Sequence, residues 1–278
     1  MSTLMDRAAR QVEPPEPDPF RFGWRDVRRI RPDGSVELDR LPLTLEDVLH
    51  PEPGDVLVEN SVHEGIRTYL SIVLRARLAR VAGALVLSDC RVDWDVPGLR
   101  HHSPDISVIF GVRHAREKWS TFDVAEEGAR PTLVIEVTSP DTRSNDLEAK
   151  LEHYHRVGVP FYVLIDEDES SGMRALRLLG YRHTPAGYEP LPPDDRGRLW
   201  LEPAGLWLAI REGRVRFEDQ QTGTAIGDYT EQVEALDASE RARAATEEAR
   251  AVAEARAEAA EIRLRDLEAE LRRLRGQG

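Results

Sequence analysis

The chain has 278 residues, 40% of them hydrophobic, which is enough for one sizeable domain with additional segments, and its one cysteine excludes an intrachain disulfide and argues against a thiolate zinc site. No apolar run approaches the roughly 20 residues of a membrane span, and the N-terminus lacks the apolar stretch of a secretory signal, so we expect a cytoplasmic protein without a membrane partner. The formal net charge of −13 does not favour nucleic-acid binding, which usually requires a basic face, although a local basic patch is compatible with it.

A leader and the start of a folded domain are predicted at the N-terminal end. Residues 1–21 include the run Glu-Pro-Pro-Glu-Pro-Asp-Pro, whose prolines prevent a helix or a central strand, so a flexible or extended leader is predicted. Residues 22–227 hold the apolar runs of one domain. The domain begins with a predicted hairpin that turns at Asp33-Gly34, and the N-cap box Thr44-Leu-Glu-Asp47 then opens a short helix.

The middle of the chain alternates helical and extended patterns. Apolar residues recur at helical spacing over residues 60–81, and an amphipathic segment at 143–157 predicts a second helix. The strand–helix–strand order around the second helix predicts a parallel crossover in a mixed sheet. Short apolar runs over 173–218 predict an antiparallel extension of the same sheet. Buried strands are predicted from continuous apolar runs at 84–93, 104–112, 131–138 and 160–166.

The last segment, residues 228–278, is rich in Ala, Glu and Arg, and it predicts one long helix. A 3-4-3 spacing of leucines near its end indicates a coiled coil that would make the protein a homo-oligomer. The alternative is a solvated single helix held by Glu–Arg pairs four residues apart. The leucines with this spacing are Leu264, Leu267, Leu271 and Leu274.

Two acidic residues and a lysine stand out in this apolar region. Asp105 lies at the start of one predicted strand, Glu136 lies inside the next, and Lys150 lies on the following helix. A buried carboxylate is costly unless a partner compensates its charge, and a divalent cation would do so. Lysine occurs only at positions 118 and 150 of this arginine-rich chain, so either a compact ammonium is needed at 150 or the distribution is chance. Oxygen ligands favour Mg²⁺ or Mn²⁺ over zinc, and such a set suits metal-assisted phosphodiester hydrolysis.

These residues belong to a longer series of motifs. Ser-Pro-Asp105 is followed by Leu-Val-Ile-Glu136-Val-Thr-Ser-Pro, by Asp146-x-x-x-Lys150-x-x-x-Tyr154, and by Gly-Val-Pro-Phe-Tyr-Val-Leu-Ile-Asp166. In order and spacing, the series resembles the Uma2 family of restriction-endonuclease-like proteins, over about residues 40–212. The resemblance implies an α/β fold with a restriction-endonuclease-like mixed β-sheet flanked by helices. It also implies a metal-dependent nuclease of the PD-(D/E)xK type that acts on DNA.

The resemblance assigns roles to individual residues. It implies that Asp105 and Glu136 are catalytic residues that bind Mg²⁺ or Mn²⁺, with the backbone carbonyl of Val137 as a further ligand. Lys150 is the implied catalytic lysine. In the wider superfamily the lysine usually stands two residues after the second carboxylate, where this chain has Thr138.

His63 and Asp146 are the expected supporting residues. Asp146 lies four residues before Lys150, so it either holds the ammonium toward the metal or forms an ordinary surface ion pair. His63 matches a histidine often found in the family's first helix, and it either reaches the site or is a hydrogen-bonded residue at the edge of the core. Glu59, one turn earlier, is an alternative for the same place.

Other histidines lie near the motifs in the sequence. Paired histidines can bind zinc, but their spacing matches no known zinc pattern, and packing or solvated roles are favoured. They are His101, His102, His153 and His155.

Three functions from different classes follow from these observations. The first is a Mg²⁺-dependent DNA endonuclease, which an arginine-lined groove would favour. The second is a catalytically inactive nuclease-fold module that binds or regulates and self-associates through its C-terminal helix, which the acidic net charge supports. The third is a hydrolase of small phosphoesters, which we rank last because the chain has no glycine-rich loop of the type that holds phosphate.

Overall fold

The computed structural model describes residues 18–58, 60–114, 116–168 and 175–275. The chain divides into two compact units, Met1–Ile226 and Gly227–Gly278. Most of the predicted leader, residues 1–17, lies outside the described residues, as does Glu59. No helix in the described part of the chain is both long enough and apolar enough to cross a membrane.

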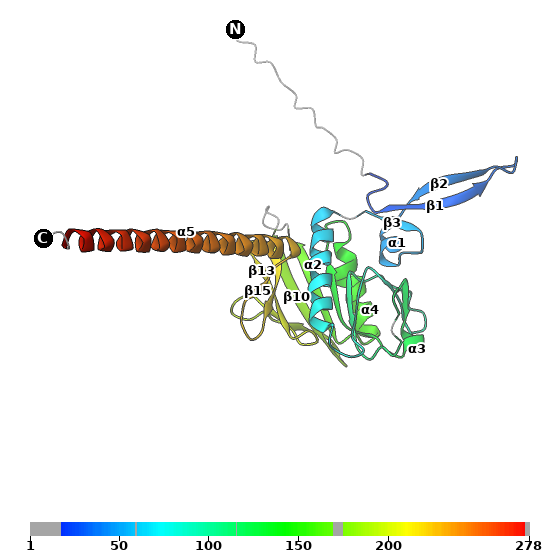
Figure 1. Cartoon of the computed structure of the whole chain (residues 1–278). Helices are drawn as coiled ribbons and strands as arrows, with labels where there is room; N and C mark the ends of the chain where they lie inside the picture. The colour runs from blue at the N-terminus through cyan, green and yellow to red at the C-terminus, as the bar shows by residue number, and fades with distance from the viewer. Residues whose placement is uncertain (1–17, 59, 115, 169–174, 276–278) are drawn as a thin grey trace, which may run out of the picture. The chain divides into compact units, whose positions relative to one another are not determined.

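The first unit begins with a small three-stranded sheet, drawn in blue in Figure 1. The expected hairpin is present, because β1 (Gly23–Ile30) pairs antiparallel with β2 (Val36–Pro42). Strand β3 (Asp55–Leu57) pairs with the start of β1, where a Cβ on Gly23 would overlap the carbonyl oxygen of Val56. The predicted capping box is confirmed at Thr44, and it opens helix α1 (Leu45–Leu49).

A six-stranded mixed sheet forms the centre of the unit. Its order is β11-β10-β9-β8-β6-β4, and β8 and β9 are parallel while the other neighbours are antiparallel. The parallel pair confirms the predicted crossover, because the connecting segment is helical. The strands are β4 (Leu85–Ser88), β6 (Ile106–Ile109), β8 (Pro131–Val137), β9 (Phe161–Asp168), β10 (Ala175–Thr184) and β11 (Gly187–Leu191).

The two faces of this sheet bury different sets of side chains. Leu133 and Ile135 of β8 share one core with buried residues of helix α2 (Ser61–Leu78), which is drawn in cyan in Figure 1. Val134 lies in a second core with Tyr154 and Val157 of the connecting helical segment. Side chains alternate between the faces of a strand, so the even-numbered residues of β8 face the connecting helix.

The strand predicted at 84–93 is in fact two strands in different sheets. Asp89 has a φ of 48°, which turns the backbone between β4 and β5 (Arg91–Asp93). Strand β5 pairs in parallel with β7 (Thr121–Asp123), and helix α3 (Val124–Glu127) follows it. The sequence did not predict β7, since three residues are too few for a periodic pattern.

The prediction of one continuous antiparallel extension over 173–218 is wrong in part. Strands β10 and β11 extend the central sheet, but the later strands form a separate four-stranded sheet. Gly180 of β10 makes room for this second sheet, because a Cβ there would overlap the side chain of Leu199. The second sheet buries its apolar face in the core that contains α2, and it consists of β12 (Leu199–Leu201), β13 (Leu206–Arg211), β14 (Arg214–Asp219) and β15 (Ala225–Ile226).

The two remaining helical predictions are confirmed with one refinement. The helix expected at 143–157 starts with a π-helical turn, η1 (Asn145–Ala149), and continues as α4 (Lys150–Arg156). The second unit contains helix α5 (Tyr229–Arg275), which is 47 residues long. The leucines of the proposed coiled coil are exposed at 264, 267 and 271, while the side chain of Leu274 lies outside the described residues.

Candidate active site

Strand alternation and register bring the two predicted metal ligands together. Glu136 occupies an even position of β8 and therefore faces α4. The antiparallel register pairs Ile106 of β6 with Ile135, so the next position places Asp105 opposite Glu136. The Asp105 backbone N–H donates to Glu136 Oε2 at 3.3 Å. Both side chains are buried, with 7% and 2% of their residues' surface exposed.

Lys150 reaches the same carboxylate from the first turn of α4. Its Nζ lies 3.0 Å from Glu136 Oε2 and 2.8 Å from Asp146 Oδ1. The Lys150 side chain is 12% exposed and that of Asp146 is 4% exposed, so the surface ion-pair interpretation of Asp146 is wrong. Asp146 instead pairs with the Lys150 ammonium along the helix, because the two residues lie four apart on one helical face.

His63 holds Asp105 from the other side of the cleft. Its Nε2 forms a hydrogen bond of 2.8 Å with Asp105 Oδ1, while the backbone N–H of Val137 donates to Asp105 Oδ2 at 2.8 Å. The Asn60 side chain caps α2 by accepting from the backbone N–H of His63, which fixes the turn that carries the imidazole. His63 therefore reaches the site directly through Asp105.

Tyr154 is also part of the site, although no role was predicted for it. Its hydroxyl donates to Glu136 Oε1 at 2.7 Å, and the residue is fully buried. Asp146, Lys150 and Tyr154 stand four residues apart, so their spacing places all three on one face of the helical segment. That spacing was the signal in the sequence from which Tyr154 could have been found.

Burial and mutual repulsion perturb the acidic groups. Burial, together with the neighbouring Asp105 and Asp146, raises the pKa of Glu136 to about 8 despite the attraction of Lys150. Burial also raises the pKa of Asp146. Burial would raise the pKa of Asp105 too, but the hydrogen bond and charge of His63 and the charge of Lys150 lower it overall. Burial would lower the pKa of Lys150, but Asp146 and Glu136 raise it, so the ammonium stays protonated.

The donor set fits a hard divalent cation. Three buried carboxylates meet one lysine ammonium, which leaves an excess of negative charge when all three are ionised. Carboxylate oxygens and a backbone carbonyl are the ligands that Mg²⁺ and Mn²⁺ prefer. Asp105, Glu136 and Val137 all line the same cleft.

The cleft has a volume of about 580 Å³, and most of the charged residues on its wall are acidic. Arg21 is the one arginine among its described lining residues, so the arginine-lined groove expected for a nuclease is not found at this place. Besides the site residues, the acidic side chains on the wall are Asp89, Asp141 and Glu167.

Comparison with known protein families decides the relationship of this chain. The Uma2 family, described as "Putative restriction endonuclease", matches residues 53–211. The chain belongs to the Uma2 family. This confirms the resemblance drawn from the motifs, and the matched residues include every predicted site residue from His63 to Lys150.

Structural similarity to a solved protein is more distant. The Uma2 chain is similar to the crystal structure of a "putative nuclease" from Anabaena variabilis, with 19% sequence identity and a TM-score of 0.42. The match covers 59% of this chain and 91% of the other. A comparison with curated proteins found no match.

The contacts of Thr138 show why the Uma2 chain has no lysine at the position that is usual in the wider superfamily. Thr138 occupies the position where a lysine is usual, and its hydroxyl donates to Asp166 Oδ1 at 2.9 Å. Asp166 also accepts hydrogen bonds from Arg143 and Arg177. This position therefore serves an ion-pair network at the end of β9, whereas the lysine that contacts Glu136 is Lys150 on the helix.

The histidines outside the site have different hydrogen-bond partners. His101 Nε2 bonds to Pro51 O and His155 Nε2 bonds to Thr184 O, which are packing roles of the expected kind. His102 and His153 bond to each other at 3.0 Å. They meet a third histidine, His50, that no sequence pattern had singled out.

Proposed function

We propose that this Uma2 protein is a Mg²⁺- or Mn²⁺-dependent endonuclease that hydrolyses DNA phosphodiester bonds. The observation that carries the proposal is the convergence of Asp105, Glu136 and Lys150 in one cleft, from two adjacent strands and the helix behind them. Asp105, Glu136 and the carbonyl of Val137 would hold the metal. When bound, the metal would polarise a phosphoryl oxygen and lower the pKa of a water molecule.

The remaining residues position these groups. His63 and the Val137 N–H fix both oxygens of Asp105, while Tyr154 fixes one oxygen of Glu136. Rigid donors of this kind keep a site organised for the transition state before substrate binds. His63 and Tyr154 are therefore positioning residues in this proposal.

Lys150 acts in this proposal as a fixed positive charge. The surrounding carboxylates raise its pKa, so it stays protonated and cannot serve as a general base at neutral pH. A protonated amine held by Asp146 can stabilise the negative charge that develops on the phosphoryl group, or it can orient the attacking water.

The acidic wall of the cleft limits how DNA could bind. Asp89, Asp141 and Glu167 would repel phosphates unless metal ions or basic residues of another subunit compensate them. We therefore infer that any DNA complex depends on a divalent cation and on basic groups outside this cleft.

A second candidate is a catalytically inactive binding or regulatory module that self-associates through α5. The acidic cleft wall favours it, as do the exposed apolar residues Leu264, Leu267 and Leu271, which are 60%, 55% and 53% exposed. A homo-oligomer through α5 would cover these side chains. This oligomer is compatible with either candidate function.

A nicking assay on supercoiled plasmid separates the two candidates. We expect cleavage with MgCl₂ or MnCl₂ and none with a chelator. Lys150→Met should reduce the rate by about 100-fold or more, because it removes the fixed charge. Lys118→Met is the matched control, since Lys118 is the other lysine and is exposed.

The outcomes have distinct meanings. Equal cleavage by the wild type and Lys150→Met would remove the case for this site. If the folded wild type binds Mn²⁺ in calorimetry but cuts no DNA, the inactive module is favoured. If it binds no Mn²⁺, the proposed metal centre is wrong.

A further inference from the structure

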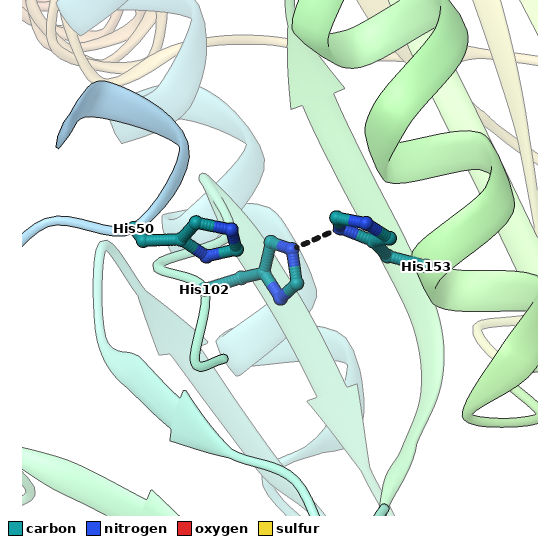
Figure 2. Close-up of side chains that lie close together, drawn as sticks. All are labelled: His50, His102 and His153. Carbon is teal, nitrogen blue, oxygen red and sulfur yellow. Dashed lines mark hydrogen bonds between the residues drawn. The ribbon is translucent and has the colours of Figure 1, made fainter. Parts of the chain in front are cut away.

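Three histidines from separate segments lie close together, as Figure 2 shows. His50 is the C-cap residue of α1, His102 precedes β6, and His153 lies on α4. One ring nitrogen of each lies within 4.8 Å of the corresponding nitrogens of the other two. His50 and His102 are buried, with 4% and 0% exposure.

The hydrogen bonds around the rings determine which nitrogens face one another. His50 Nδ1 lies 2.7 Å from the carbonyl oxygen of His101, to which it must donate, so the lone pair of the neutral ring is on Nε2. This is the arrangement usual for a metal-binding histidine, whose other nitrogen donates to a backbone carbonyl.

His102 has the opposite arrangement. The indole N–H of Trp94 donates to His102 Nδ1 at 2.8 Å, so the proton of the neutral ring is on Nε2. That proton is donated to Nδ1 of His153, 3.0 Å away. The dashed line in Figure 2 marks this bond. Without metal, the Nε2–H group of His102 therefore points at the lone pair on Nδ1 of His153.

The protein environment keeps the three rings neutral. Burial lowers the pKa of His102 to about 2, and burial also lowers the pKa values of His50 and His153. Neutral imidazole is the form that binds metal ions.

We propose that His50, His102 and His153 bind one zinc ion or a similar borderline transition metal. Nitrogen ligands select zinc over the hard Mg²⁺ that suits the carboxylate site. A tetrahedral ion with bonds of about 2.0–2.1 Å needs ligand atoms roughly 3.3 Å apart, which small side-chain rotations achieve from the observed arrangement. To bind through Nε2 as a neutral ring, His102 takes up its other tautomer, in which the proton has moved from Nε2 to Nδ1, and the Trp94 N–H gives up its hydrogen bond to that nitrogen.

Glu46 supplies the fourth ligand in this proposal. It lies one turn before His50 on α1, and its Oε1 is 3.8 Å from His50 Nε2. Its carboxylate is now paired with Arg100 at 3.3 Å, and it is accessible enough to turn toward a bound ion. Three imidazoles and one carboxylate complete a closed tetrahedral set, which is typical of a structural site.

The metal would connect three segments that form the candidate active site. His102 lies three residues before Asp105, and His153 directly precedes Tyr154, which holds Glu136. The rings of His102 and Tyr154 are also in contact, with centroids 5.3 Å apart. A zinc ion here would therefore fix α4 relative to the start of β6.

The test is calorimetric titration of ZnCl₂ into the full chain after treatment with a chelator. We expect one zinc per chain whose affinity falls by about 100-fold or more in His153→Gln. His155→Gln is the matched control, because His155 lies on the same helix and bonds to Thr184 outside the cluster. It should bind zinc like the wild type.

Substitution with Co²⁺ provides a second readout that does not depend on stability. Wild type and His155→Gln should show the strong visible absorption of tetrahedral Co²⁺, and His153→Gln should lose it while circular dichroism shows the fold intact. Absence of zinc binding to the wild type, or equal binding by wild type and His153→Gln, would overturn the proposal. If His153→Gln still binds one zinc with wild-type affinity, the zinc is bound at the carboxylate site instead.

Discussion

The Tyr154 hydroxyl donates a hydrogen bond of 2.7 Å to Oε1 of Glu136 inside the core, from the same helix whose first residue contacts Oε2. One helical face therefore contacts both oxygens of the buried carboxylate, and the Asp105 backbone N–H on β6 also donates to Oε2.

Replacement of Tyr154 tests this relationship. Tyr154→Phe removes the donor and leaves a buried carboxylate oxygen unpaired, so the free energy of unfolding should fall by about 1–3 kcal/mol. Divalent-metal affinity and plasmid nicking should fall as well. Tyr188→Phe is the control, because Tyr188 donates to the carbonyl of Val159 and should affect stability alone. Urea denaturation and the nicking assay give the two readouts, and an unchanged nicking rate in Tyr154→Phe would contradict the positioning role.

His63 should matter for both activity and stability. His63→Ala removes the hydrogen bond to Asp105 Oδ1 but keeps the backbone of α2, so we expect a loss of about 10–100-fold in nicking or Mn²⁺ affinity. The thermal midpoint should fall as well, because the change leaves Asp105 Oδ1 without this partner and the two side chains are only 12% and 10% exposed. Wild-type activity in His63→Ala would show that Asp105 needs no support from α2.

Asp166 should contribute stability that depends on pH. Burial would raise its pKa, but hydrogen bonds from Arg143, Arg177 and Thr138 lower it below its ordinary value. A carboxylate with a lowered pKa in the folded state stabilises the protein above its unfolded pKa of about 3.9, and this contribution is lost as the pH falls through the folded value. Asp166→Asn should lower the free energy of unfolding at pH 7 by about 2–3 kcal/mol, less than for a fully buried pair, because both arginines reach solvent.

The check is urea denaturation of wild type and Asp166→Asn between pH 7 and pH 3. The difference between the two proteins should shrink toward acid. A difference that stays constant over this range would show that Asp166 acts through packing and not through its charge.

Cys90 should be unreactive in the native protein. Burial, with a smaller effect of Asp89, raises the pKa of its thiol to about 11, so little thiolate exists at pH 8. Alkylation by iodoacetamide should be at least about 100-fold slower in native protein than in urea. Mass spectrometry gives a direct answer, because the chain has one cysteine. Rapid native labelling would indicate that the segment between β4 and β5 opens locally.

If the protein self-associates through α5, glutamate in place of the seam leucines should abolish the oligomer. If the leucine spacing near its end forms a coiled coil, light scattering should give about twice the chain mass. Leu267→Glu with Leu271→Glu should return the protein to a monomer, because glutamate at seam positions cannot be buried. Ala260→Glu with Ala257→Glu tests whether the seam continues toward the N-terminus. A monomeric wild type would leave α5 as a solvated helix.

Local patterns in the sequence determined much of this protein. Strand alternation, capping chemistry and helical spacing depend on neighbouring residues, so they predicted the hairpin at Asp33-Gly34, the cap at Thr44 and the long helix α5. The motif series likewise identified Asp105, Glu136 and Lys150 as a group, and the fold places them in one cleft.

The tertiary structure alone decided which distant segments meet. The separate sheet of β12–β15 packs closely on β10, because Gly180 leaves room for the side chain of Leu199. The cluster of His50, His102 and His153 comes from three segments that are far apart in the chain. The burial of the Lys150–Asp146 pair was also undetermined, since spacing shows that two charges are neighbours but not whether water reaches them. Periodicity describes one element at a time, whereas burial and side-chain contacts between elements arise only when the apolar faces pack together.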